Sequence, residues 1–314
     1  MGTLIARKRL AQRSSARGQF SALCAIALLL ATSVCGVVSP LLAQSAPAHK
    51  HKPRAKPTPS ALPPEIKSQL PVYPPGAMRF HDGEQFVFEA SWIGISAATA
   101  RVRLHSNRKN ASIWIAEAWV QTGPLADLFF RMRDYVKEDI GKQDLAPRAM
   151  YIAQRENQRN DDYTVAFDRA ADRVTITKKN ARGSSSREFI ADNGWGMISG
   201  GIMALSQPLA VGKTYNFDVF SGTERYVFSF EVTEREHVHV PLGEFDAWRI
   251  VPDVLYWSDG NLKGEGRDTV LWISADNRHL PLRIQSATFI GYVRADLIEV
   301  DDGAGVLRAP ANAG

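Results

Sequence analysis

The chain has 314 residues, of which 45% are hydrophobic and 23% charged, and its formal net charge is +5 at pH 7. Five of its 38 basic residues lie before residue 20, where there is no acidic residue, so the rest of the chain balances 33 basic against 33 acidic residues. This balance excludes nucleic acid or a strongly acidic molecule as a partner held by net charge. The only cysteines, Cys24 and Cys35, lie in the same N-terminal part, so the fold has to be stable without disulfides.

Residues 1 to 45 predict a Sec-type signal peptide. A basic segment without acids is followed by an uncharged, mostly apolar run from Phe20 to Ala43 and then by small residues. We expect cleavage after Ala43 or Ser45 and export to the periplasm of a Gram-negative cell. The alternative is an uncleaved leader anchored in the inner membrane, because a run of this length can span a bilayer.

Residues 46 to 78 predict a disordered, proline-rich and basic linker, since nine prolines in 33 residues favour an extended chain that buries little. A basic cluster at its start either makes weak contact with anionic lipid headgroups or serves as a solubilising tether; it consists of Lys50, Lys52, Arg54 and Lys56. Residues 301 to 314 predict a disordered tail.

Residues 79 to 300 predict one all-β domain. Segments such as "EQFVFEASW", "AATARVRL" and "RYVFSFEV" alternate apolar and polar positions, which is typical of half-buried antiparallel strands. About a dozen such short strands, with only one or two short helices expected within residues 124–132 and 193–207, show no βαβ rhythm. We therefore expect a single curled antiparallel sheet in the form of a barrel, half-barrel or sandwich.

The first and last strands of this domain contain similar segments. Both "SWIGIS" and "TFIGYV" place a glycine after an aromatic–isoleucine pair, at Gly94 and Gly291. Glycine inside a strand commonly marks a tight turn or bend. We interpret both as structural glycines of hairpins, and we expect the first and last elements to pair and cover each other's edge.

The sequence signals for catalytic and metal-binding residues are weak. His237 and His239 share a strand face but lack a third ligand at metal-site spacing, and His279 lies beside a turn. A carboxylate group for acid–base chemistry would use Asp134, Glu138 and Asp139, although the interleaved basic residues favour a charged strand instead. The serines at 184–186 indicate a loop. The sequence therefore predicts no catalytic residue, no metal and no cofactor.

Aromatic residues form a stripe on one side of their strands, and this stripe is the main candidate for ligand contact. Such residues usually fill a β core, but in a wide curled sheet they can line an apolar cavity. The candidate lining residues are Phe86, Phe88, Trp92, Tyr226, Phe228 and Phe230.

The sequence resembles a bacterial family, the domain of unknown function numbered 3108, over about residues 80 to 300. The N-terminal motif of the family matches Gly83, Glu84, Phe86, Phe88, Trp92, Gly94, Ile95 and Ala97, and its C-terminal motifs match "WISADNRHLPLRI" and "GYVRADL". Ala275 and Asn277 stand near positions where acids are usual. The resemblance implies an exported, β-rich envelope protein, and it implies no reaction or catalytic residues.

These observations leave three functional hypotheses. The first is a non-enzymatic periplasmic envelope protein whose concave, aromatic-lined face binds a lipid-like or other apolar ligand. The alternative is a structural or scaffold protein that docks an envelope partner through a sheet edge or outer face. A hydrolase using carboxylate chemistry is the third. A cavity behind the aromatic stripe favours the first, and an exposed apolar patch favours the second.

Overall fold

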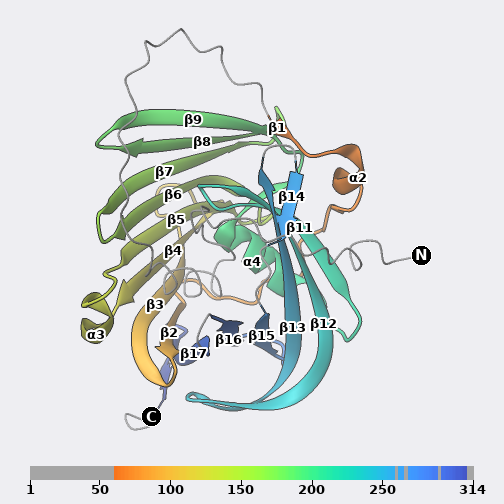
Figure 1. Ribbon diagram of the computed structural model, residues 1–314. Coiled ribbons are helices and arrows are strands. Elements are labelled where there is room, and N and C mark those ends of the chain that lie inside the picture. Colours follow the sequence, from red (N-terminus) through yellow and green to blue (C-terminus); the bar gives the residue numbers. More distant parts are fainter. Residues whose placement is uncertain (1–59, 259–260, 265–267, 289–290, 310–314) are drawn as a thin grey trace.

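The computed structural model describes residues 60–258, 261–264, 268–288 and 291–309. Strands dominate, and they form one large sheet that curls around a buried helix (Figure 1). The expected all-β class and single curled sheet are confirmed. The described residues contain eighteen strands and three short helices, more than expected, because several strands of two to four residues have no detectable alternation. The expected signal peptide and the basic cluster of the expected linker lie outside the described residues.

The elements have the following bounds. The strands are β1 (Ser60–Ala61), β2 (Gln85–Trp92), β3 (Ile95–Ser106), β4 (Ile113–Thr122), β5 (Arg133–Gly141), β6 (Pro147–Glu156), β7 (Arg159–Asp168), β8 (Arg173–Asn180), β9 (Gly183–Ile190), β10 (Gly194–Gly196), β11 (Thr214–Phe220), β12 (Arg225–Val240), β13 (Gly243–Ser258), β14 (Asn261–Gly264), β15 (Thr269–Ser274), β16 (Pro281–Ala287), β17 (Tyr292–Asp301) and β18 (Val306–Arg308). The helices are α2 (Pro64–Lys67), α3 (Pro124–Asp127) and α4 (Met197–Ser206).

Two antiparallel meanders make up the sheet. Strands β2 to β9 pair in chain order, and β11, β12, β13, β15, β16 and β17 form the second series. The loop expected at the serines of 184–186 is instead part of β9, paired with β8. The two meanders join where β17 pairs with β2, so that Ala295 lies opposite Ala90 and Leu297 opposite Phe88.

This junction confirms the interpretation of the repeated segments. Gly94 and Gly291 adopt φ angles of 78° and 69° in the turns before β3 and β17. This left-handed region is accessible to glycine at little cost. The first and last long strands thus pair, and neither leaves an exposed edge at this point.

The other two ends of the sheet meet at a seam. There β9 pairs with β1 and β10 pairs with β11, and no strand register joins β1 to β10 in the described part of the chain. Side chains close the gap instead. Arg225 at the start of β12 donates two hydrogen bonds to buried Asp218, of 2.8 and 2.6 Å, and one of 3.0 Å to the carbonyl oxygen of Ile190 on β9. The ring of Phe220 packs edge-on against Phe189, with centroids 5.4 Å apart.

Two expected disordered segments pack onto the domain. Residues 60–78 cover the seam. Leu62 is buried, the Tyr73 ring lies 5.0 Å from the ring of Phe217, and the Tyr73 hydroxyl accepts a hydrogen bond from the backbone N–H of Asn216. The linker therefore does not extend to residue 78. The tail expected from residue 301 also differs, because β18 pairs with β17. Composition misses both segments because each is held by a few contacts to the sheet and has no core of its own.

Helix α4 fills the interior of the curled sheet (Figure 1). It is apolar on nearly all sides and eight of its ten residues are buried, which is typical of a core helix. None of the described helices is long and apolar enough to cross a bilayer.

The seam gives the first prediction. Arg225→Met leaves the Asp218 carboxylate buried without its partner, so we expect the free energy of unfolding to fall by about 3–5 kcal/mol. The double variant Asp218→Leu/Arg225→Met removes both charges and should recover most of that loss. Urea unfolding of the three proteins tests this, and equal stability of the single and double variants would contradict the role of the ion pair.

Candidate functional site

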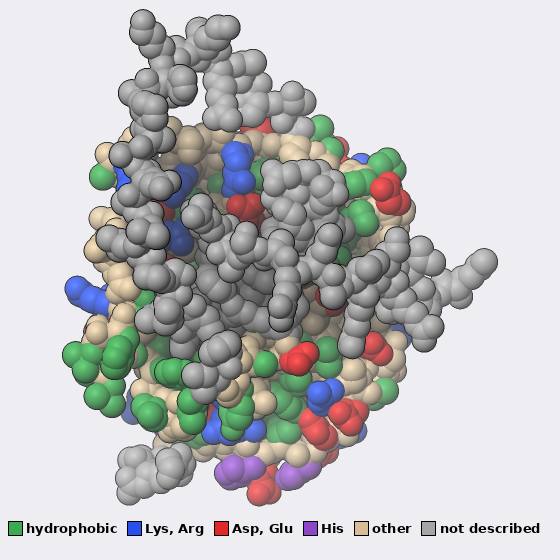
Figure 2. Space-filling model, in the orientation of Figure 1, with side chains coloured by type: hydrophobic (Ala, Val, Ile, Leu, Met, Phe, Trp, Pro, Cys, Tyr) green, Lys and Arg blue, Asp and Glu red, His purple; other side chains and the backbone are tan. Residues whose placement is uncertain are grey.

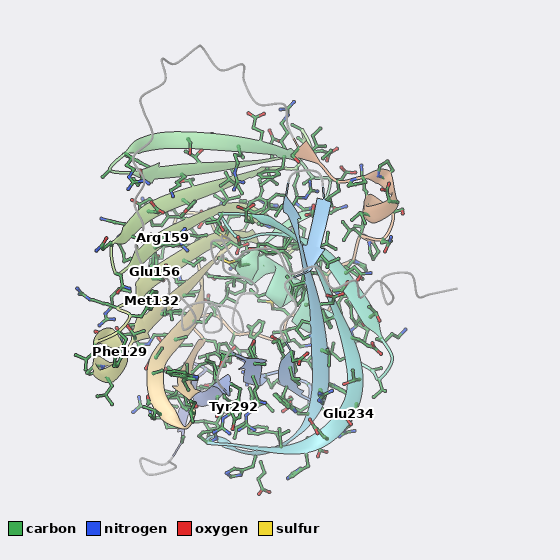
Figure 3. The ribbon with its side chains drawn as sticks, viewed as in Figure 1. Phe129, Met132, Glu156, Arg159, Glu234 and Tyr292 are labelled. Carbon is green, nitrogen blue, oxygen red and sulfur yellow. The ribbon has the colours of Figure 1, made fainter. Side chains whose placement is uncertain are left out.

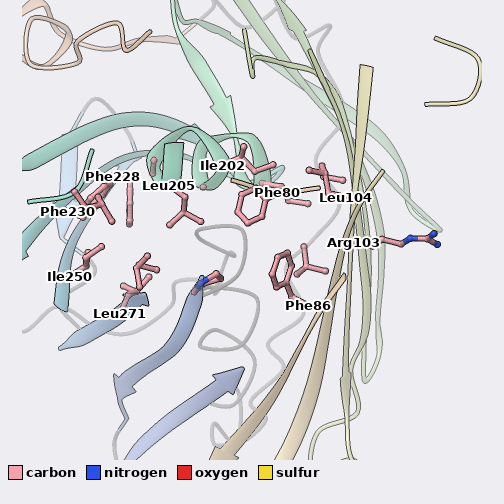
Figure 4. A pocket seen from close by; sticks show the side chains of 18 residues that line it. Phe80, Phe86, Arg103, Leu104, Ile202, Leu205, Phe228, Phe230, Ile250 and Leu271 are labelled. Atoms are coloured by element: carbon pink, nitrogen blue, oxygen red, sulfur yellow. The ribbon is translucent and has the colours of Figure 1, made fainter. Parts of the chain in front are cut away.

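A predominantly apolar cavity lies between α4 and the sheet. Its volume is about 100 Å³, and the side chains that line it come from three parts of the fold (Figure 4). Among the described residues on its boundary the only charged one is Arg103, and its side chain points away from the space. The lining residues are Phe80, Phe86, Val102, Leu104 and Ala116 from the first meander and the segment before it; Ile198, Gly201, Ile202, Ala204, Leu205 and Leu209 from α4 and its C-terminal loop; and Phe228, Phe230, Ile250, Leu271, Ile273 and Pro281 from the second meander.

Only half of the aromatic stripe borders the cavity. Phe86, Phe228 and Phe230 line it. Phe88 and Tyr226 are buried but belong to the packed interior elsewhere, whereas Trp92 at the end of β2 remains 38% exposed. The alternation that groups these residues on one face is correct, but strand position decides which of them reach the cavity. The residues from α4 were missed because its apolar sequence indicates burial without indicating which strands it contacts.

The N-terminus of α4 is attached to the sheet by Glu138 of β5. The backbone N–H groups of Ile198 and Ser199 donate to the two carboxylate oxygens of Glu138, at 2.8 and 3.3 Å. Gly196 precedes the helix, and a Cβ there would collide with this carboxylate. Burial raises the pKa of Glu138 to about 7, against the opposing effect of these hydrogen bonds. Glu138, one of the three carboxylates considered from the sequence for acid–base chemistry, is therefore a buried helix cap.

The C-terminus of α4 is attached by the turn between β15 and β16. His279 in this turn is buried, has a φ of 46°, and donates from Nδ1 to the carbonyl oxygen of Leu205 at 2.8 Å. Burial lowers the pKa of His279. Next to it, Arg278 forms an ion pair with the fully buried Glu84 just before β2. The two family motifs, far apart in sequence, therefore meet beside the cavity.

The remaining nominated polar residues do not form one site. Asp134 and Glu138 share the inner face of β5, whereas Asp139 faces outward beside Lys137. His237 is exposed and lies 3.3 Å from both Asp246 and Glu244 across the β12–β13 hairpin. Among the described residues no three His, Cys, Asp or Glu side chains are arranged to hold a metal ion.

Apolar side chains are exposed at one end of the sheet. We define the apolar rim as the exposed side chains of the β2–β3 hairpin, of α3 and the residues after it, and of the start of β17: Trp92, Ile93, Ile95, Leu125, Leu128, Phe129 and Tyr292. The hairpin and α3 are adjacent, since Gly123 N–H donates to the Ala97 carbonyl at 2.8 Å. Figure 2 shows hydrophobic side chains gathered at this lower left side, where Figure 3 labels Phe129.

The fold and the site together define a protein whose strands form a barrel-like enclosure around an apolar helix. The model of the family described as "Protein of unknown function (DUF3108)" matches residues 87–298, and the chain belongs to this family. None of the curated proteins compared with it matches.

Three solved structures resemble the fold at low identity. A β-barrel-like protein of the domain of unknown function DUF1849 from Brucella abortus has a TM-score of 0.47 and 8% identity, and the match covers 71% of this chain and 98% of that one. A protein from Bacteroides fragilis, described as exported and as having a YmcC-like fold, gives 0.30 and 13%, covering 72% and 99%. A protein from Parabacteroides distasonis, described as a lipoprotein, gives 0.32 and 10%, covering 72% and 99%.

The helix cap at Glu138 makes stability depend on pH. Because its pKa is about 7 in the folded protein and the ordinary value of 4.5 applies to the unfolded chain, the contribution of Glu138 is fully present below pH ~4.5 and is lost as the pH rises to 7. Relative to Glu138→Gln, the free energy of unfolding of the wild-type protein should fall by up to about 1.4 kcal/mol per pH unit as the pH rises through this window. Urea unfolding at pH 4.5, 6 and 7.5 measures the difference. Parallel pH profiles of the two proteins would show that Glu138 titrates normally, and exposed Glu188→Gln serves as the control.

Proposed function

We propose that this protein is an exported, periplasmic envelope protein that acts by binding the apolar part of a lipid-like ligand, without catalysis. The cavity carries this proposal, because its lining is apolar from three sides and includes four phenylalanine rings. Pockets that recognise apolar ligands have such linings. The basic, apolar and small-residue order of the leader supports export.

The size of the cavity limits what it holds in this conformation. An apolar cavity of about 150 Å³ admits benzene, so about 100 Å³ accommodates a small apolar group or the end of a chain. A longer chain requires α4 to move relative to the sheet. The two attachments of α4, at Glu138 and at His279, are then the contacts that control how far the space can open.

Filling the cavity tests this function. Ala116 lines it, and Ala118, two residues further along the same face of β4, is equally buried but does not. Ala116→Leu occupies the free space and should reduce binding of palmitate at least tenfold with little loss of stability. Ala118→Leu adds volume at a buried position outside the cavity, so it should cost about 1–3 kcal/mol of stability while palmitate binding persists.

Native mass spectrometry of the purified protein mixed with palmitate measures the adduct, and urea unfolding measures stability. An adduct of equal intensity in wild type and Ala116→Leu would place the ligand elsewhere. A wild-type protein that takes up no palmitate would argue against the proposed function.

The apolar rim supports a second candidate, docking of an envelope protein partner. Exposed apolar surface on this scale commonly marks an interaction site, and Leu128 and Phe129 are each 75% exposed. Both side chains contribute little to the core of the domain, so they are available to a partner.

Site-specific photocrosslinking in the native cell tests the rim. A crosslinking amino acid at Leu128 should give one discrete adduct, and the same group at exposed Glu188 on β9 should give none. The double variant Trp92→Ser/Phe129→Ser should abolish the Leu128 adduct while changing the unfolding free energy by less than about 1 kcal/mol, since both side chains are exposed. Identical adduct patterns at the two positions would exclude docking through the rim.

A further inference from the structure

A strip of polar side chains crosses the inner face of the first meander, away from the cavity. Gln154 of β6 lies opposite Asp161 of β7. The neighbouring registers place Asp134 of β5 beside Gln154 and Asn180 of β8 beside Asp161. The other inward positions of these strands are apolar except Glu138, which caps α4. We define the polar strip as Asp134, Gln154, Glu156, Arg159, Asp161, Tyr163, Lys178 and Asn180.

One half of the strip is fully hydrogen-bonded. Asp161 accepts bonds from Arg159 Nε at 3.0 Å, Asn180 Nδ2 at 2.7 Å and Tyr163 Oη at 3.3 Å, and Lys178 Nζ lies 2.7 Å away. Burial alone would raise the pKa of Asp161, but the hydrogen bonds from Lys178, Asn180 and Arg159 hold it well below its usual range. The cationic groups of the strip are therefore already paired with a carboxylate.

The other half holds two carboxyls, Asp134 and Glu156, of which Glu156 lies 3.6 Å from Arg159 Nη1. Burial, with the adjacent Glu156 carboxyl, raises the pKa of Asp134 to about 7, although the Arg155 backbone N–H donates to it at 2.7 Å. Between these two carboxyls and Asp161 lies Gln154, which is only 5% exposed. Its Oε1 accepts no hydrogen bond from any residue of the described ranges. A buried acceptor without a donor costs free energy.

The strip is within reach of solvent. Side chains at its border keep part of their surface exposed: 19% for Glu156, 26% for Arg159 and 36% for Lys178. Figure 3 shows Glu156 and Arg159 near each other at the turn between β6 and β7. The border of the strip, though not Gln154 Oε1 itself, is therefore accessible to a small group.

We infer that the polar strip binds a ligand through a primary ammonium group. The buried atom of the strip that lacks a partner, Gln154 Oε1, is an acceptor, so the ligand has to donate. An ammonium group offers three N–H donors and no acceptor, and it can bridge Gln154 Oε1 and the Asp134–Glu156 pair at once with charge-assisted bonds. A hydroxyl offers one donor and adds acceptors of its own. An anion would have to displace Asp161 from Arg159 and Lys178. This inference is independent of the proposed cavity function.

The test compares ethanolamine with ethylene glycol, which has the same shape but a hydroxyl in place of the ammonium. NMR titrations of ¹⁵N-labelled protein at pH 8, above the pKa of Asp134, should show saturable shifts of the β5–β7 amides with ethanolamine only. Gln154→Leu and Asp134→Asn should each weaken ethanolamine binding about tenfold. The control is Asp162→Asn, which removes a carboxylate from the outer face of β7 and should leave binding unchanged.

Folding and binding are separated in this design. Gln154→Leu removes a buried acceptor without a partner, so its stability should equal or exceed that of the wild type, and lost binding then reports the site. Each of the following results would overturn the inference: no saturable shift with ethanolamine, equal shifts with ethylene glycol, or the same loss of affinity in Asp162→Asn as in Gln154→Leu. Tetramethylammonium, which carries the charge without donors, should not bind, and its binding would also overturn the inference.

Discussion

The fold depends on how a curled sheet closes without a continuous ladder of hydrogen bonds. Its two ends meet at a seam where Arg225 holds both Asp218 and the carbonyl oxygen of Ile190. Two charges buried this deeply are tolerated only with near-ideal mutual geometry. That requirement fixes β11 and β12 in register and sets their position relative to β9. With the seam fixed, the interior has a definite width, and α4 can occupy it while leaving the cavity at one place along its length.

The residues that make the sequence resemble its family serve this architecture. Glu84 and Arg278 come from the two ends of the domain and form an ion pair, and the neighbouring His279 fixes the last turn of α4. The glycines of the repeated segments allow β2 and β17 to turn and pair. Because these positions stabilise the enclosure, a match to the motifs carries information about fold and little about ligand. Functional information has to come from the inward side chains between the motifs.

The sequence was sufficient for the class of fold and for the pairing of the first and last strands, since alternation and glycine placement are local signals. Of the six aromatic residues that the sequence suggested as a lining, Phe86, Phe228 and Phe230 line the cavity. The sequence could not place Trp92 outside the cavity, because exposure at the end of a strand depends on neighbouring chain. Leu62 and Tyr73 were missed for a related reason: a proline-rich segment has no periodicity, yet it can cover a seam built by other residues. The polar strip has no recognisable sequence motif, because its residues come from four strands and become neighbours only when those strands pair.

The cavity and the polar strip lie on the same inner surface but obey opposite chemical demands. Around α4, inward positions are apolar and exclude water, so only apolar groups gain by entering. On β5 to β8 the inward positions change to carboxylates, amides and cations, which a stable core alone would not select because burying them costs free energy unless each is paired. Asp161 is paired in full, and Gln154 Oε1 is not. A protein keeps such an imbalance where function outweighs stability, which is the physical reason to look for a ligand at Gln154.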